Sequence, residues 1–426
     1  MRGGIAVRRT VRSRAPAARA SYLYACAVLS VLYLFLPFGG YERMMEGKYV
    51  CFLALTLAYL AVMAVAAPVE RPRMTPPRRC AAAYLACSAL SALCSPYGAR
   101  TLLGGTRRDG LVTAALYVAV FFCLSRYLRA DRRLIYLSAA AVTICDALVL
   151  LQTAGHDPLR LYPAGLGYRD GNVAYAGFFA GTSGNIDFKA FLLALALCVF
   201  AAALVRLRAW ALAPAIAATL LALYRLDVAA AWAGLAFAAV WSPALLLRRG
   251  RGAALAVSAA LTAAALLLLR RYGGAEPTLI EASRFLRGDF DGALGSGRVS
   301  IWRGCLTLVR ERPLLGGGPD TLWLRGLEPM TWFHDGAAVP AEITAAHNEY
   351  LGVLVNQGAL ALAAYLSLLA CTLARCFRRA DAPEYAVCGA GLLCYGAMAV
   401  FSVSTCITAP YVWLLLALVQ KDEIDC

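Results

Sequence analysis

Charge and histidine are both scarce in this chain. Only 15% of its 426 residues are charged and only three are histidine, His156, His334 and His347, whereas 61% are hydrophobic. This composition excludes an ordinary soluble globular domain and indicates a polytopic membrane protein. Although the chain has 15 cysteines, no pair has C-x-x-C spacing and none clusters with histidine. We therefore expect neither a zinc site nor a disulfide framework, and we expect the cysteines to pack as small apolar residues.

Basic residues outnumber acidic residues by 41 to 25, which gives a net charge of +16. In a soluble protein this balance would suggest a nucleic-acid partner. In a membrane protein it fits the excess of Lys and Arg in cytoplasmic loops, so we expect the lipid bilayer and no nucleic acid as partner. The basic N-terminus leads into an apolar run that no small-residue cleavage site follows. We therefore expect an uncleaved first span rather than a signal peptide.

Apolar runs long enough to cross a bilayer, which takes roughly 17–25 residues, recur along the whole chain. They predict an all-α fold: a polytopic membrane helix bundle of about 12 transmembrane helices with one large extracytoplasmic loop. The predicted spans lie near 21–37, 49–66, 80–95, 110–127, 134–153, 188–205, 209–224, 227–247, 253–269, 349–373, 385–403 and 408–420.

The distribution of Lys and Arg orients these spans. With the N-terminus in the cytoplasm, 23 basic residues fall inside and nine, including Lys48, fall in the short outer segments; the remaining nine lie in 270–346. The bias predicts a cytoplasmic N-terminus and C-terminus. The predicted organisation is a basic cytoplasmic N-terminus (1–20), spans one to nine (21–269), a large extracytoplasmic loop (270–346), spans ten to twelve (347–420) and a cytoplasmic tail (421–426).

The large loop contains several motifs. Apolar residues at helical spacing predict a helix from 298 to 309, on which Arg298 and Arg303 either face lipid head groups or bind phosphate. The run "GGGPD" lacks the flanking residues of a phosphate-binding P-loop and is interpreted as a plain loop. The pair Asp289 and Asp291 in "GDFDG" is a weak candidate for a metal, with a simple turn as the alternative.

Polar groups stand at three places where outer segments enter spans. His347 in "HNEYL" precedes the tenth span, where it is either a proton acceptor or a helix cap. Arg107 in "LLGGTRRDG" is either a functional cation or an interfacial anchor. Asp187 and Lys189 open another span, where charge is costly unless it is used.

Four stretches together resemble the O-antigen ligase and O-antigen polymerase family of bacterial membrane glycosyltransferases. They are "LLGGTRRDGL", "GTSGNIDFKAFL", "GRVSIWRGCLTLVRERPLLGGGPDTL" and "AHNEYLGVLVNQGALAL", and the last two are the most specific. The resemblance implies transfer of a glycan from a polyprenyl-diphosphate carrier, at the outer face of the inner or plasma membrane, to a hydroxyl of a glycolipid, a glycan or a protein. It implies no cofactor and no metal.

The resemblance also assigns roles to residues. His347 matches a histidine thought to act as base on the acceptor hydroxyl, and Arg298 matches an arginine thought to bind the diphosphate. A further arginine expected near mid-chain is replaced by Ala229, with Arg225 one helical turn away. Residues expected to contribute to substrate binding are Arg303, Asn348, Arg225 and Arg107.

Two alternatives remain open at this level. A repeat-unit polymerase of the same family carries the same motifs as a ligase. A transporter or flippase for lipid-linked glycans would also have twelve spans, but it would carry more charges in mid-span and an internal repeat. Asp146 is the clearest mid-span charge, and no internal repeat is evident.

Overall fold

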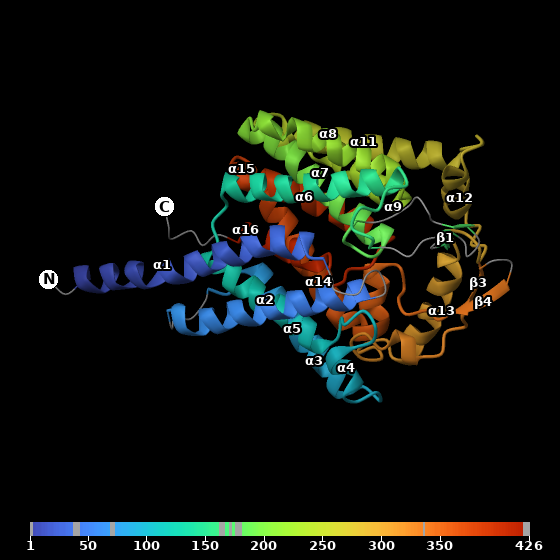
Figure 1. Cartoon of the computed structure of the whole chain (residues 1–426), viewed down its shortest axis with the longest axis horizontal. Coiled ribbons are helices and arrows are strands. Elements are labelled where there is room, and N and C mark those ends of the chain that lie inside the picture. Colours follow the sequence, from blue (N-terminus) through green and yellow to red (C-terminus); the bar gives the residue numbers. More distant parts are fainter. Residues whose placement is uncertain are drawn as a thin grey trace.

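The computed structural model of the chain describes residues 3–36, 43–68, 73–161, 167–169, 173–174, 181–334 and 337–420. Helices lie side by side as a bundle, and two short two-stranded ribbons lie at one end of it (Figure 1). Apart from these ribbons, the predicted all-α class is confirmed. The predicted cytoplasmic tail, 421–426, falls outside the described residues.

The predicted segments fall on helices, with one change at the N-terminus. The first helix begins at Gly3, so the basic segment predicted at 1–20 is helical from residue 3 and continuous with the first span. The helices are α1 (Gly3–Ala27), α2 (Met44–Ala66), α3 (Pro76–Leu93), α4 (Arg100–Leu103), α5 (Leu111–Tyr127), α6 (Arg132–Thr153), α7 (Ile186–Leu207), α8 (Ala213–Leu226), α9 (Ala229–Trp241), α10 (Pro243–Leu246), α11 (Arg251–Arg270), α12 (Pro277–Leu286), α13 (Arg298–Glu311), α14 (Glu349–Arg378), α15 (Pro383–Met398) and α16 (Ala409–Leu418). The strands are β1 (Gly167–Arg169) paired with β2 (Val173–Ala174), and β3 (Met330–His334) paired with β4 (Ala337–Ala341), both antiparallel.

Six helices of the described part are long and apolar enough to cross a membrane. The other predicted spans fall on helices that are shorter or less apolar, such as α9 and α16. The protein is therefore a helical membrane protein by length and composition of these segments. The six candidates are Arg14–Leu32, Met44–Ala66, Arg132–Thr153, Ile186–Leu207, Arg251–Arg270 and Glu349–Arg378.

The short helix α16 lies in the centre of the bundle. Every residue from Ala409 to Ala417 is buried, so this helix is apolar on all sides rather than amphipathic. Its Trp413 packs against the rings of Tyr84, Tyr117 and Phe121, with centroids 6.4, 6.0 and 5.8 Å away. This aromatic packing fixes α16 against α3 and α5, and with it the segment 399–408 that leads into it.

The predicted span at 349–373 is broken in its middle. Gly358 has φ 84° and ψ 175°, which interrupts α14. The loop that follows α13 passes through the gap: Gly317 and Gly318 donate to the carbonyl oxygens of Val355 and Asn356 at 3.1 and 2.7 Å, and Ala359 donates to that of Pro313 at 2.9 Å. The freed helix carbonyls thus find partners, as a break at membrane depth requires. The "GGGPD" run is therefore a wedge in α14, and its prediction as a plain loop was incomplete.

Three charged side chains inside the helices are buried, and each forms hydrogen bonds. Lys48, counted above among outer-segment cations, lies within α2 and is 2% exposed. Its Nζ donates to the carbonyl oxygens of Leu32 and Tyr33 at 2.7 and 2.9 Å. Lys189, fully buried, donates to the Tyr33 hydroxyl at 2.8 Å. Asp146, also fully buried, accepts from a threonine hydroxyl on α8 at 2.8 Å.

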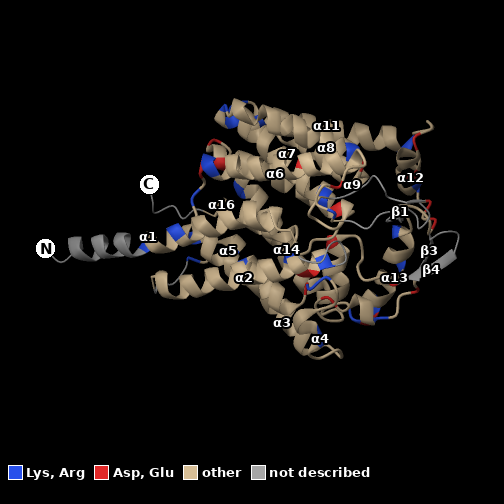
Figure 2. Ribbon diagram, in the orientation of Figure 1, with Lys and Arg blue, Asp and Glu red and all other residues tan. Residues whose placement is uncertain are grey.

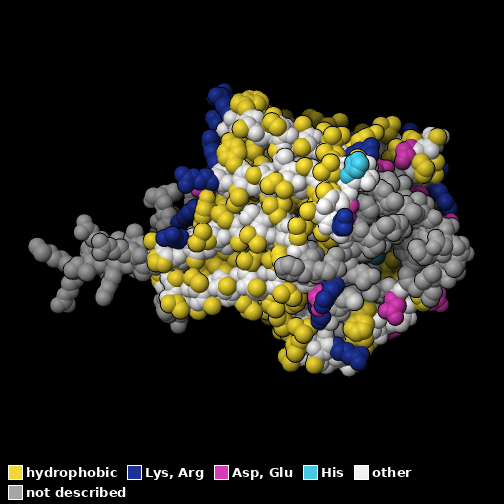
Figure 3. Space-filling view, viewed as in Figure 1, with side chains coloured by type: hydrophobic (Ala, Val, Ile, Leu, Met, Phe, Trp, Pro, Cys, Tyr) yellow, Lys and Arg dark blue, Asp and Glu magenta, His cyan; other side chains and the backbone are white. Residues whose placement is uncertain are grey.

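Charges otherwise gather at the two ends of the bundle, and apolar side chains cover the face in view (Figures 2 and 3). One end, here called the loop end, carries α12, α13 and the ribbons. At the opposite end Arg206 donates to the carbonyl oxygens of Ala380 and Asp381, each at 2.8 Å, and Arg251 pairs with Asp381 at 2.6 Å. Polar ends and apolar sides are the pattern expected of a bundle that crosses a membrane.

Candidate functional site

Three of the predicted site residues meet at the loop end. Arg107 lies in the turn between α4 and α5, Arg298 is the first residue of α13, and His347 stands just before α14. Burial, and after it the charges of Arg107 and Arg298, lowers the pKa of His347 from 6.5 to about 3. The two arginines come from segments almost 200 residues apart, yet both are close enough to act on one imidazole.

His347 is held in place by the residues on either side. It has φ 48°, in the left-handed region that few side chains other than Asn, Asp and His adopt. The next residue, Asn348, caps α14: its side-chain oxygen accepts the Leu351 N–H at 3.0 Å. On the other side the indole Nε1 of Trp302 donates to the Ala346 carbonyl oxygen at 2.9 Å. The cap of this helix is therefore Asn348, and the imidazole of His347 is not needed for it.

Arg298 has hydrogen-bonding capacity to spare. Its Nε is buried without a partner among the described residues, and its Nη1 makes only a long contact, 3.5 Å, with the Gly295 carbonyl oxygen. A guanidinium presents several donors in a planar fork that matches the oxygens of a phosphate group. The free donors of Arg298 thus fit an anion at this position.

Arg107 lies among four acidic groups, of which the sequence drew attention only to Asp187. Burial lowers the pKa of its guanidinium. Its Nε contacts the Thr344 hydroxyl at 3.4 Å. The carboxylates close enough to oppose the shift are those of Asp320, Asp109, Asp187 and Glu349.

Asp320 fastens the turn that carries Arg107. Its Oδ2 accepts the backbone N–H groups of Gly105 and Asp109 at 2.8 and 3.2 Å. Asp320 ends the "GGGPD" wedge, so the break in α14 and the Arg107 turn form one connected unit. Burial raises the pKa of Asp320, and these two N–H groups and Arg107 oppose the shift.

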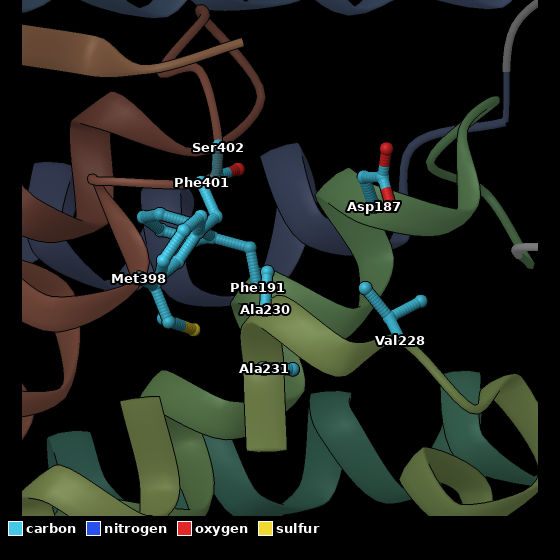
Figure 4. A pocket seen from close by; sticks show the side chains of 8 residues that line it. All are labelled: Asp187, Phe191, Val228, Ala230, Ala231, Met398, Phe401 and Ser402. Carbon is cyan, nitrogen blue, oxygen red and sulfur yellow. The ribbon is translucent and has the colours of Figure 1, made fainter. Parts of the chain in front are cut away.

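Two hollows open beside these groups, on either side of the segment 401–404. The first, about 210 Å³, lies between α7, α9 and α15, and Asp187 lines it on the side opposite the rings of Phe191 and Phe401 (Figure 4). The second, about 510 Å³, is lined by polar groups that include Arg107 and Glu349. An apolar hollow and a polar hollow therefore adjoin one cluster of charges.

Two of the predicted arginines lie away from this cluster. Arg225, at the end of α8, is exposed and donates to the Thr153 carbonyl oxygen at 3.1 Å. Arg303 is exposed on α13 and donates to the carbonyl oxygen of Phe290. Ala229, where the resemblance leads one to expect an arginine, begins α9 next to Ala230, which lines the first hollow. The side chain of Arg225 therefore does not replace that arginine in this structure.

The two carboxylates that were weak metal candidates form ion pairs with an arginine. Asp289 and Asp291 both pair with Arg284, at 2.7 and 3.2 Å. Within the described residues no group of three or more His, Cys, Asp or Glu side chains could hold a metal ion. The "GDFDG" segment is a turn clamped by Arg284, as the alternative prediction had it.

The four stretches that carry the resemblance all contribute to the loop end. "LLGGTRRDGL" supplies Arg107, the long third stretch supplies Arg298 and the wedge, and "AHNEYL" supplies His347. In "GTSGN" the Asn185 side chain caps α7 by accepting the N–H groups of Asp187 and Phe188 at 2.8 and 3.1 Å. No family model and no curated protein matches this chain. Its function is therefore inferred from the arrangement of these residues.

Proposed function

We propose that the protein is an O-antigen ligase-like membrane glycosyltransferase. It moves a glycan from a polyprenyl-diphosphate carrier to an acceptor hydroxyl, in the assembly of a surface polysaccharide or lipopolysaccharide. The observation that carries the proposal is the convergence of one histidine with two arginines, His347 with Arg107 and Arg298, at one end of a membrane helix bundle. The resemblance of the four stretches that build this end supports the same reaction.

The proposed step is a displacement at the anomeric carbon of the donor sugar. The acceptor oxygen forms a bond to that carbon while the bond to the diphosphate oxygen breaks. The hydroxyl proton passes to the imidazole of His347, and the electron pair leaves with the polyprenyl diphosphate. Arg298 and Arg107 stabilise the negative charge on the leaving group, which is the main need of such a transition state. Attack from the face opposite the diphosphate inverts the anomeric configuration.

The low pKa of His347 is compatible with a role as base in this step. Burial and two arginines hold the pKa at about 3, so the imidazole is neutral and a weak base. A bound diphosphate places negative charge beside Arg107 and Arg298 and offsets two of the causes of the shift. The basicity of His347 then rises when the donor is present, nearer to the range in which a general base works well.

The proposed placement is an inner or plasma membrane, crossed twelve times, with both termini in the cytoplasm and residues 270–346 outside. The charge bias between inner and outer segments supports this orientation. So does the position of α12 and α13, which lie together at the loop end (Figure 1). The acceptor would approach from outside the cell, and the lipid carrier from the side, through the bilayer.

A transporter for lipid-linked glycans is a second candidate, and specific observations favour it. The helix α14 is broken at Gly358, and Lys48 and Lys189 are buried within helices, as in many transporters. The two functions differ in what they do with the donor. An enzyme consumes the sugar-diphosphate bond, whereas a transporter leaves that bond intact and changes the side of the membrane on which the donor lies.

The deciding experiment places the purified protein in vesicles with a polyprenyl-diphosphate-linked glycan. Three acceptors are offered separately: lipid A core, a second lipid-linked glycan and a hydroxyl-rich protein. We expect polyprenyl diphosphate to be released with at least one acceptor. His347→Ala should lower the rate by about 10²–10⁴-fold, the usual contribution of a general base. Arg298→Ala should lower it at least about 100-fold, as loss of a charge-stabilising group does.

A matched control is Arg310→Ala, since Arg310 is an exposed arginine on the same helix as Arg298. Its rate should stay within about twofold of wild type, because exposed charges far from a site contribute little. Normal transfer by both His347→Ala and Arg298→Ala at equal expression would rule out the assigned roles. Movement of intact donor across the vesicle membrane, without release of diphosphate, would favour the transporter.

A further inference from the structure

Four aromatic rings follow one another at the loop end. Phe285 lies at the end of α12, Phe290 in the "GDFDG" turn, Trp302 on α13 and Phe401 after α15. The centroid of Phe285 lies 5.1 Å from that of Phe290 and 6.1 Å from that of Trp302, and Trp302 lies 6.4 Å from Phe401. These residues are here called the aromatic row. Consecutive rings are spaced at about the length of one sugar unit in a glycan chain.

Three of the four rings are open to their surroundings, and Trp302 is half-buried. Phe285 is 38% exposed, Phe290 47% and Phe401 40%. Large apolar side chains gathered on a surface, with polar groups around them, commonly mark a binding site. Phe285 meets Phe290 and Trp302 at steep angles, 76° and 85°, whereas Trp302 and Phe401 are inclined by 30°. The rings therefore turn their faces in more than one direction.

The turn that carries Phe290 is rigidly built. Arg284 pairs with Asp289 and Asp291, and Asp289 also accepts the N–H of Asp291 at 3.2 Å. Arg303 donates to the carbonyl oxygen of Phe290 itself. Two arginines from two helices therefore hold the backbone of this turn in place, which is the kind of support that a pre-organised binding surface needs.

Charge next to Phe290 argues against burial of the ring in lipid. Arg284 lowers the pKa of Asp289 and, after a backbone hydrogen bond, that of Asp291, so both carboxyl groups are ionised at neutral pH. These carboxylates flank Phe290 in the sequence and are 46% and 50% exposed. Inserting the ring into the bilayer would draw two anions toward apolar chains and anionic head groups, which is unfavourable.

The same charges suit a sugar. Carboxylates accept hydrogen bonds from hydroxyl groups. The electron-rich face of an aromatic ring attracts the polarised C–H groups of a pyranose. A flat ring between two carboxylates can therefore contact both the apolar face and the hydroxyl groups of one sugar.

The aromatic row is continuous with the candidate site. Trp302 donates its indole N–H to the carbonyl oxygen of Ala346, the residue before His347. At the far end of the row, Phe401 lines the first hollow together with Asp187 (Figure 4). A chain bound along the row would therefore run from Phe290 toward His347.

We propose that the aromatic row is a glycan-binding subsite, which holds sugar units of the substrate beyond the unit that reacts at His347. This inference rests on the proposed function in that it takes a glycan as the substrate. The row acts in binding and takes no part in the transfer step. It would favour substrates with several sugars over those with one.

The test uses binding alone, with the full chain in detergent and an array of soluble oligosaccharides that carry neither lipid nor diphosphate. Wild-type protein should bind a subset of them, and Phe290→Ala and Phe285→Ala should each weaken the best binder roughly tenfold, about what one aromatic contact contributes. Phe290→Tyr keeps a flat ring and should retain affinity. The matched control is Tyr224→Ala on α8, because Tyr224 is 68% exposed near the same end and lies outside the row.

Each outcome separates the possibilities. Binding that is lost in Phe290→Ala but kept in Tyr224→Ala and in His347→Ala supports the subsite, whether or not transfer occurs. Absence of oligosaccharide binding by wild type, or equal binding by Phe290→Ala, would overturn it. If Phe290→Ala and Tyr224→Ala bind like wild type but both reduce membrane insertion, the rings are interfacial anchors. Transfer without oligosaccharide binding would leave the proposed function standing and remove only this inference.

Discussion

A Cβ atom placed on Gly358 would lie 2.2 Å from the carbonyl oxygen of Leu314. The two residues touch because the loop after α13 passes through the break in α14. Gly358→Ala should therefore destabilise the protein by more than about 2 kcal/mol, since the new side chain meets backbone and its φ of 84° is unfavourable for alanine. Thermal unfolding in detergent would measure this as a fall in the apparent melting temperature.

The control lies six residues earlier in the same helix. A Cβ on Gly352 would meet no atom within 4 Å, and its backbone is helical. Gly352→Ala should leave stability unchanged or raise it by up to about 1 kcal/mol, the helix preference of alanine over glycine. Equal melting temperatures for Gly358→Ala and wild type would mean that the wedge is not packed in the break.

A second prediction concerns the charge around His347. Because its pKa is lowered first by burial and then by Arg107 and Arg298, Arg298→Gln should raise that pKa but leave it below 6.5. Histidine-selective NMR titration can follow it, since the chain has only three histidines to assign. Arg310→Gln should not change the titration. A wild-type His347 that titrates near 6.5 would contradict the electrostatic coupling to both arginines.

The same depressed pKa predicts a pH dependence of stability. The unfolded chain takes up this proton near pH 6.5, whereas the folded chain takes it up only near pH 3. The free energy of unfolding therefore includes the full contribution of a neutral, buried His347 above about pH 6.5. This contribution is lost as the pH falls from 6.5 toward 3, because the unfolded chain then binds a proton that the folded chain does not. His347→Gln should make the melting temperature fall less steeply between pH 7 and 5 than in wild type. If the melting temperatures of wild type and His347→Gln fall in parallel with pH, His347 does not cause the pH dependence.

The sequence predicted the helices well because their signal is local. Apolar runs of sufficient length placed helices at all twelve predicted positions, and the spacing of apolar residues placed α13 from Arg298 onward. The position of Lys48 shows the limit of this reasoning. A charged residue near the start of an apolar run was counted as an outer-loop residue, but backbone carbonyls at the end of another helix allow it to be buried.

The candidate site was only partly predictable for the same reason. His347, Arg298 and Arg107 were chosen as polar residues at helix entrances, and the structure brings them together. Asp320 was not chosen, since its role depends on contacts with residues more than 200 positions away. No local pattern reveals that the "GGGPD" run enters a gap in a helix that begins some thirty residues later.

A fourth prediction isolates the hydrogen bond from Trp302 to Ala346. Trp302→Phe keeps an aromatic ring but removes the donor, a loss of about 0.5–1.5 kcal/mol. If this bond positions His347, kcat should fall about 2–10-fold, while oligosaccharide binding and KM should change little. The control is Trp241→Phe, which removes a comparable indole bond to Thr262, between α9 and α11. A fall in kcat of the same size in both variants would indicate a general loss of stability instead.

The last prediction tests whether Asp320 acts through Arg107. Asp320→Asn keeps the shape of the side chain and its left-handed backbone, which asparagine tolerates, but weakens two charge-assisted bonds to the Arg107 turn. We expect a loss of about 1–3 kcal/mol in stability and at least a tenfold fall in transfer rate, because a small displacement of Arg107 misplaces its charge. Asp381→Asn, which breaks an exposed ion pair at the opposite end, should cost less than about 1 kcal/mol and leave transfer unchanged. The decisive measurement is the double variant: once Arg107→Gln is present, Asp320→Asn should slow transfer little further, since the group that it positions is gone. If the two effects on rate multiply instead, Asp320 acts independently of Arg107 and the wedge through α14 does not position that arginine.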